Sequence, residues 1–298
     1  MNGRLWVGVV LVSLSAQSTA SEVGANLLMK MNDALHRMDY TGTLVHIKGE
    51  DVNTLKVSHI VEGGVEKEVI TSLNGSENAV SKERSSFSLA KVPQSIESMK
   101  KVYSLDVGGT KKVAMRDCQV VIARPKDKMR YLQKYCIDKE TGLPLSYSLI
   151  NNKHKAVERF TFTQVEIHAS NNKASVEQTA AVANVPPETI LPGGSPSANW
   201  EVTELPKGFY FGQVPASQNA EVQKGENTDH FILTDGLSSI SVFISSNTTV
   251  QPKVTSAINS GALNVLTSQK NNHRITLVGE VPRATMQSVF QNLKYLGE

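Results

Sequence analysis

The chain has two cysteines, Cys118 and Cys136, and their spacing is the clearest chemical signal in the sequence. Residues 118–124 are rich in β-branched side chains, 125–128 have turn composition, and 129–137 have the pattern of a returning strand. Folding back near Asp127 pairs position 118 directly with 136, within reach of a disulfide. We therefore predict a structural cross-strand bond. The alternative, a redox-active pair, favours a C-x-x-C spacing, which these cysteines lack.

Other reactive side chains show no catalytic pattern. The seven histidines form no H-E-x-x-H or H-x-H pair, and the cysteines are already assigned to a bond, so no zinc site is predicted. Residues 107–111 only superficially resemble a phosphate-binding loop and are interpreted as a hairpin turn. We expect no catalytic residues, no metal and no cofactor. This favours a binding protein over a hydrolase whose catalytic groups converge from distant segments.

Composition and charge narrow the class of protein further. The 298 residues are 40% hydrophobic and 20% charged, with 31 Lys and Arg against 28 Asp and Glu. These values are typical of a globular chain, and a formal net charge of +3 with no basic run indicates no dedicated nucleic-acid surface. At ~100 to 200 residues per domain, the length favours two domains over one.

Residues 1–20 have the pattern of a cleaved export signal. Arg4 is basic, 5–14 form an apolar core of about half the ~20 residues that span a bilayer, and 18–20 are small. We predict cleavage near Ala20 and export to an oxidising compartment, where a disulfide persists. A retained membrane anchor is the minor alternative, and we expect no membrane span after cleavage.

A helix and then a series of strands are expected after the signal. Leu28, Met31, Leu35 and Met38 recur at helical spacing and define one apolar face. Alternating runs typical of strands follow at 42–47, 55–61, 65–70, 143–150 and 157–167. We predict an α+β protein whose first part is a strongly curved antiparallel sheet, an open half-barrel, with the helix on its inner face. The space between them could hold an apolar ligand, or side chains could simply fill it as a core.

Turn and breaker residues divide the chain into two blocks. They are dense between 168 and 199, and we place a linker at 181–199, between domains at 21–180 and 200–298. The second block is expected to be a small α+β domain with a turn at Asp235-Gly236. Its strands are expected at 231–234, 239–244, 262–267 and 275–281. Pro282 opens a final helix whose apolar face is formed by Met286, Val289, Phe290, Leu293 and Leu296.

Several phrases, read in order, resemble the RseB and MucB family of periplasmic sigma-E regulators. In the first block they are 40–43 (YTGT), 82–84 (KER), 124–131 (RPKDKMRY) and 137–143 (IDKETGL). In the second block they are 205–209 (LPKGF), 230–237 (HFILTDGL), 241–244 (SVFI) and 278–282 (VGEVP). Their order and spacing agree over most of the mature chain.

The resemblance implies a fold and a function. It implies a first domain similar to the lipoprotein carriers LolA and LolB, and a second domain that contributes to binding a transmembrane anti-sigma factor. Family members bind the periplasmic segment of RseA or MucA and shield it from the first-cutting protease, DegS or its counterpart. An envelope-stress ligand, lipopolysaccharide or mislocalised lipoprotein, releases them. The alternative is a periplasmic lipid or lipoprotein carrier that binds no anti-sigma factor. A homo-oligomer is also considered.

Candidate binding residues follow from this implied function. The phosphates of a lipopolysaccharide require cations at the mouth of an apolar cleft, and the candidates are Arg84, Arg124, Lys128 and Arg130. Each could instead be an ordinary solvated charge. In the second block, the candidates for partner contact are His230, Leu237 and Phe243. The structural alternatives are a hydrogen-bonded histidine and a core phenylalanine.

Overall fold

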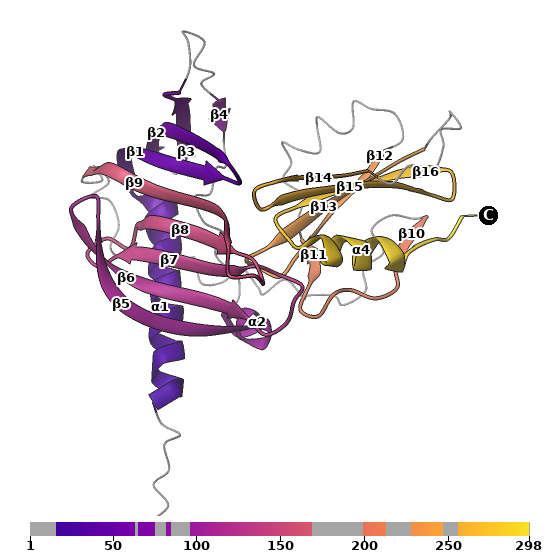
Figure 1. Ribbon diagram of the computed structural model, residues 1–298, viewed down its shortest axis with the longest axis horizontal. Helices are drawn as coiled ribbons and strands as arrows, with labels where there is room; N and C mark the ends of the chain where they lie inside the picture. Colours follow the sequence, from indigo (N-terminus) through magenta and orange to yellow (C-terminus); the bar gives the residue numbers. More distant parts are fainter. Residues whose placement is uncertain are drawn as a thin grey trace, which may run out of the picture.

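The computed structural model describes residues 16–62, 65–74, 82–84, 96–168, 199–212, 228–246 and 256–297. The predicted signal lies outside the described residues up to residue 15, and so does the predicted linker apart from Asn199. The described part consists mainly of two antiparallel sheets with few helices (Figure 1). This agrees with the predicted α+β class.

The larger sheet has nine strands, and every predicted strand of the first block lies in it. In spatial order these are β4 (Lys82–Arg84), β3 (Val65–Ser72), β2 (Asp51–Glu62), β1 (Asp39–Lys48), β9 (Ala156–His168), β8 (Pro144–Ile150), β7 (Leu132–Asp138), β6 (Arg116–Pro125) and β5 (Tyr103–Val113). Since β4 and β5 are its two edges in the described part of the chain, the sheet is open and is not a closed barrel.

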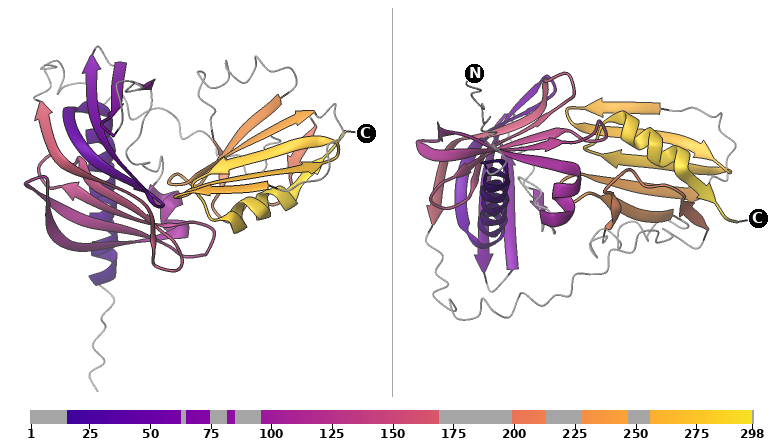
Figure 2. Two further views of the ribbon diagram at one scale, coloured as in Figure 1. Left: turned by 45° about the horizontal axis from the view of Figure 1, so that its top comes forward. Right: turned by 90° about the horizontal axis from the view of Figure 1, so that it is seen from below.

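Helix α1 (Ala16–Arg37) lies across one face of this sheet (Figure 1, Figure 2). The predicted apolar face is confirmed for Leu28, Met31 and Leu35, which are buried in the core beneath the helix. Met38 follows the end of the helix. A second helix, α2 (Ile96–Val102), precedes β5 and buries Met99 and Val102. The space between α1 and the sheet is therefore occupied by core side chains.

The predicted disulfide is confirmed, but the predicted register of its hairpin is wrong. Cys118 and Cys136 are bonded, with their Cα atoms 5.2 Å apart. However, Cys118 lies opposite Asp138, and Val120 lies opposite Cys136, so the cysteines are diagonal neighbours. The connection is centred one residue later than predicted, which moves every pair by two positions. Sheet twist brings one set of diagonal neighbours close enough to be bonded.

Residues 107–111 do not form the predicted hairpin turn. They lie within β5, where the pairing with β6 shifts register between Val107 and Thr110. Two consecutive glycines, Gly108 and Gly109, stand at the shift. A β-bulge is the usual structure at such a point in a strand, and glycine makes it easier to form.

The second block forms a six-stranded sheet with its own core. The strands, in spatial order, are β11 (Tyr210–Gly212), β12 (Thr228–Thr234), β13 (Ser239–Ser246), β16 (His273–Gly279), β15 (Leu263–Lys270) and β14 (Ser256–Ser260). Helix α4 (Arg283–Asn292) covers one face (Figure 2). A two-stranded sheet pairs β10 (Trp200–Val202) with β17 (Leu293–Tyr295). The predicted final helix is thus shorter than expected, because Leu293 begins a strand and Leu296 is exposed.

Candidate functional site

The two larger sheets meet around a buried ion pair. Arg130, in the connection between β6 and β7, donates from Nε to Oδ2 of Asp235 at 2.7 Å, and neither side chain has any exposed surface. The remaining guanidinium nitrogens donate to Oδ2 of Asp127 and to the carbonyl oxygen of Lys207, both at 2.6 Å. The hydroxyl of Tyr103 donates to the same Asp235 oxygen at 3.0 Å. A buried charge with this many partners is fully compensated.

Asp235 also shapes the turn between β12 and β13. Its Oδ1 accepts hydrogen bonds from the backbone N–H groups of Leu237 at 2.9 Å and Ser238 at 2.7 Å. Gly236 has a φ of 93°, a conformation that favours glycine. The predicted turn is therefore present, and its carboxylate binds both its own backbone and the neighbouring sheet. We call residues 235–238 the junction turn.

The junction turn inserts an apolar side chain into the core of the larger sheet. Leu237 is 2% exposed and belongs to the same hydrophobic cluster as the residues beneath α1. The prediction that Leu237 contacts a partner does not agree with this position, because almost the whole residue is buried. Leu237 is instead a core residue, and burying a leucine side chain stabilises a fold by about 1.5–3 kcal/mol.

Gln133 connects the junction turn to the inner face of the larger sheet. Its Nε2 donates to the carbonyl oxygen of Leu237 at 3.2 Å, and its Oε1 accepts from the hydroxyls of Tyr135 at 2.5 Å and Tyr147 at 3.0 Å. Burial raises the pKa of Tyr103, Tyr135 and Tyr147 well above the usual value for a phenol, so all three stay neutral donors. Four polar side chains from one sheet are thus satisfied around one turn of the other.

Further contacts fix the sheets on either side of this turn. Asn264 donates to the hydroxyl of Tyr131 at 3.1 Å, and Thr285 donates from Oγ1 to the carbonyl oxygen of Met129 at 2.6 Å. Two glycines allow close approach. A Cβ on Gly208 would lie 2.4 Å from Val102, and one on Gly261 would lie 2.4 Å from Lys48, and both glycines have positive φ. The junction is closely packed at each of these points.

The four predicted ligand-binding cations are not brought together. Arg84 lies in β4, where its backbone pairs with Glu68, at one end of the larger sheet. Arg124 lies near the other edge, half exposed and paired with Asp106 at 3.2 Å, and Lys128 is exposed in the connection after β6. The structure does not agree with the prediction for Arg130, because its guanidinium is buried in the junction and cannot lie at the open mouth of a cleft.

The other predicted partner residues lie on the smaller sheet. His230 and Phe243 are cross-strand neighbours whose rings stack at 4.3 Å between centroids with 8° between planes. They alternate with Phe231 and Val242, which are buried in the core beneath α4, so they lie on the opposite face. Burial lowers the pKa of His230. Within the described residues, neither ring nitrogen of His230 has a hydrogen-bond partner.

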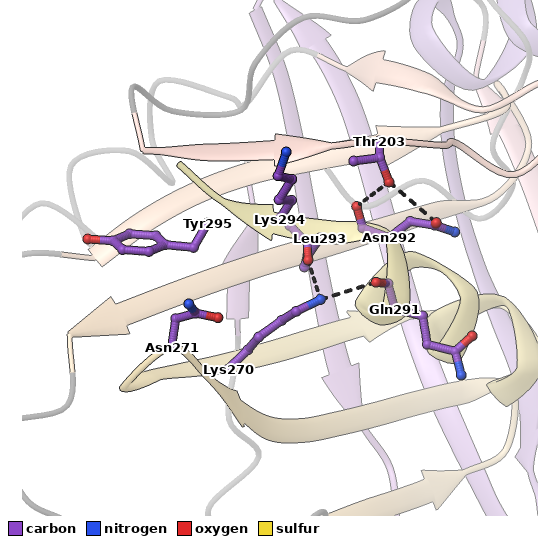
Figure 3. Close-up of a pocket in the computed structure, with 8 residues that line it drawn as sticks. All are labelled: Thr203, Lys270, Asn271, Gln291, Asn292, Leu293, Lys294 and Tyr295. Carbon is purple, nitrogen blue, oxygen red and sulfur yellow. Dashed lines mark hydrogen bonds between the residues drawn. The ribbon is translucent and has the colours of Figure 1, made fainter. Parts of the chain in front are cut away.

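A pocket at the end of α4 has a structural explanation. It is lined by Lys270 and the residues around the end of the helix, and its volume is about 320 Å³ (Figure 3). Lys270 donates from Nζ to the carbonyl oxygens of Gln291, in the last turn of α4, and of Leu293, the residue that follows the helix. Burial lowers the pKa of Lys270. The lysine caps the helix, and no ligand is required to account for it.

Within the described ranges of the chain, no three His, Cys, Asp or Glu side chains converge as a set that could hold a metal ion. No helix in the same ranges combines the length and apolar character needed to cross a bilayer.

The fold and the junction define an α+β protein of two sheet domains that meet at a buried junction. The chain belongs to the MucB/RseB family: the model of the MucB/RseB N-terminal domain matches residues 24–181, and that of the MucB/RseB C-terminal domain matches 194–294. The sigma-E factor regulatory protein RseB of Salmonella typhimurium is 25% identical over 321 residues, covering 98% of each chain. RseB of Escherichia coli strain K12 is 24% identical over 318 residues with the same coverage.

The MucB branch of the family is also similar. The sigma factor AlgU regulatory protein MucB of Pseudomonas aeruginosa is 27% identical over 201 residues, covering 64% of this chain and 60% of that protein. A crystal structure of MucB in complex with MucA(peri) has a TM-score of 0.66 and 23% identity, covering 92% of this chain and 100% of that one. The Pseudomonas aeruginosa MucA/MucB complex has a TM-score of 0.67 and 24% identity, covering 93% and 100%. These two structures show that the fold is shared.

Proposed function

We propose that the protein is a periplasmic negative regulator of a sigma-E type envelope stress response. It binds the periplasmic segment of a membrane anti-sigma factor of the RseA or MucA kind and shields that segment from the first proteolytic cut. One observation carries this proposal: sigma-E regulatory proteins match the chain over 98% of its length. Support comes from the solved relatives, which are complexes of MucB with MucA.

The mechanism requires only that the protein occupy the cleavage site of the anti-sigma factor, and it involves no covalent step. A protein bound over a cleavage site slows proteolysis in proportion to the fraction bound, and a ligand that prefers the free form lowers that fraction. The absence of a catalytic role is part of the proposal. A carrier that binds no anti-sigma factor is the second candidate. It is less favoured because a carrier needs only the first sheet, whereas here the second sheet is built into the fold and supplies Leu237 to the core of the first.

We propose the face of the smaller sheet opposite α4 as part of the partner surface. Phe243 and His230 form a half-buried aromatic stack there, and His230 has two unsatisfied ring nitrogens within the described chain. A partner backbone or side chain that supplies one hydrogen bond to this histidine would remove the cost of its desolvation. Large aromatic side chains of this kind are frequent in binding hot spots.

We further propose that the larger sheet is a half-barrel of the LolA type that receives a lipid-like ligand. The core side chains of α1 occupy its inner face, so acyl chains would have to compete with Leu28, Met31 and Leu35 for this space. Arg124 and Lys128 remain the candidate contacts for an anionic headgroup, together with Arg84. Export to the periplasm with cleavage near Ala20 is supported by the pattern of residues 1–20.

A cleavage-protection assay tests the function. The periplasmic segment of the host anti-sigma factor is incubated with its first-cutting protease and increasing amounts of residues 21–298. We expect the cleavage rate to fall with saturation, and we expect Phe243→Ser to weaken protection about tenfold or more. Val52→Ser removes an exposed apolar side chain from the larger sheet and serves as the matched control. Unchanged cleavage at saturating, folded protein would contradict the proposal.

A further inference from the structure

A cationic pocket lies on the larger sheet, on the face away from α1. Lys134, Ser148 and Arg159 are directly opposite one another on β7, β8 and β9. They alternate along their strands with Tyr135, Tyr147 and Phe160, which belong to or pack against the core beneath α1. Lys111, from β5, lines the same pocket, whose volume is about 250 Å³. We call this the outer-face pocket.

The charge of the outer-face pocket is uncompensated. Its lining includes Lys111, Lys134 and Arg159 and no carboxylate. Over the residues that the structure describes, none of these three side chains has an ion pair or a hydrogen bond. Two arginines elsewhere on this sheet are paired with carboxylates: Arg124 with Asp106 at 3.2 Å and Arg116 with Asp138 at 2.9 Å. Like charges gathered on one sheet face repel, and a bound anion would relieve that repulsion.

The floor of the pocket is polar and held in place. Ser146 donates from Oγ to the carbonyl oxygen of Phe160 at 3.0 Å, and its oxygen lies 2.9 Å from Oγ1 of Thr161. Ser148 is 8% exposed and lies between the two cations of its row. Cys136, also in the lining, is bonded to Cys118 and ties β7 to β6. The arginine and the lysines can donate charge-assisted hydrogen bonds to the oxygens of a tetrahedral anion such as phosphate, and the serine hydroxyl between them can donate one more.

We propose that the outer-face pocket binds the phosphate group of a phosphate ester or of free phosphate. Arg159 supplies a planar pair of donors, Lys134 and Lys111 supply point charges, and Ser148 supplies a hydroxyl. The site is separate from the junction and from the face of the smaller sheet that carries Phe243. The proposal therefore does not depend on binding of an anti-sigma factor.

Titration with inorganic phosphate tests the site. Residues 21–298 are titrated while backbone amide resonances are followed by NMR. We expect shifts centred on positions 134, 148 and 159, and we expect Lys134→Gln with Arg159→Gln to weaken binding about tenfold or more, since two charge-assisted contacts are removed. The matched control, Lys153→Gln with Lys155→Gln, removes the same charge from two exposed lysines in the β8–β9 connection. The single variant Arg159→Gln serves if the double variant does not fold.

Vesicles distinguish the source of the phosphate group. Vesicles of phosphatidylglycerol and of phosphatidylcholine are compared in a flotation assay with the same variants. Binding of phosphatidylglycerol vesicles that Arg159→Gln weakens supports a lipid headgroup, whereas binding of inorganic phosphate alone supports a free ion. The proposal is overturned if neither probe binds, or if the lysine control weakens binding as much as the pocket variant.

Discussion

The Nε atom of Arg130 lies 2.7 Å from Oδ2 of Asp235, although 105 residues separate the two in sequence, and both side chains are fully buried. Arg130 lies in the connection between β6 and β7 of the larger sheet, and Asp235 lies in the turn between β12 and β13 of the smaller. Because a buried charge without its partner is costly, this pair makes the packing of the second sheet a condition for the stability of the first.

Replacing Asp235 tests this coupling. Asp235→Ala removes the fully buried carboxylate partner of Arg130 and leaves only the partly exposed Asp127 beside the guanidinium. We expect a loss of about 3–5 kcal/mol in the free energy of unfolding, measured in urea. Asp229→Ala is the control, because Asp229 lies in β12, the strand that leads into the junction turn, and its side chain makes no ion pair within the described residues. The double variant Arg130→Met with Asp235→Leu should lose less than Asp235→Ala. Equal losses for Asp229→Ala and Asp235→Ala would contradict the account.

Close approach at the junction makes a second prediction. Gly208→Ala places a Cβ 2.4 Å from Val102 at a φ of +80°, so we expect a loss of ~1–3 kcal/mol from overpacking and backbone strain. Gly109→Ala adds the same methyl group where nothing lies within 4 Å. Thermal unfolding should show a lowered Tm for the first variant and little change for the second. A similar Tm for both variants would contradict the claim that close packing of Gly208 against Val102 stabilises the protein.

The disulfide gives a third prediction. Cys118 and Cys136 enclose a loop with a sequence separation of 18, and loss of such a crosslink costs about 3 kcal/mol in the chain-entropy description. Urea unfolding of the wild type with and without a reductant should differ by this amount. The variant with both cysteines changed to alanine should no longer respond to the reductant. A wild type whose unfolding midpoint is unaffected by complete reduction, verified by thiol counting, would refute a stabilising role.

Burial of His230 predicts a pH dependence of stability. Its pKa in the folded protein is lowered because desolvation disfavours the charged ring, so the unfolded chain binds the proton first as the pH falls. Stability should therefore decrease as the pH falls below the ordinary histidine value of 6.5. His230→Phe keeps an aromatic ring beside Phe243 and should reduce this decrease. His168→Phe changes an exposed histidine and is the control for urea unfolding between neutral and mildly acidic pH.

Local patterns in the sequence predicted the elements more reliably than their contacts. The helical spacing of Leu28, Met31 and Leu35, the turn at Asp235-Gly236 and the bond between Cys118 and Cys136 all follow from neighbours within a few turns or one hairpin, and all are present. The hairpin register was wrong because composition does not show where a connection is centred. A two-position shift keeps each side chain on the same face.

The junction could not be predicted from the same patterns. Arg130 was interpreted as a surface cation and Leu237 as a partner contact, since unpaired charges and turn residues are usually exposed. Their burial depends on residues that are distant in the sequence: Tyr103, Gln133 and Asp235 make the polar contacts that compensate it. For Asp235 the sequence predicted only a position in a turn. The resemblance to the family indicated two domains but gave no information on this contact.

Isothermal titration calorimetry tests the central claim most directly. Purified residues 21–298 are titrated with the periplasmic segment of the host's RseA-like or MucA-like anti-sigma factor, using the whole chain because the second sheet completes the first core. We predict submicromolar binding that Phe243→Ser weakens and Val52→Ser does not. Absence of binding by the intact, folded protein would contradict the proposed regulator and favour the lipid carrier.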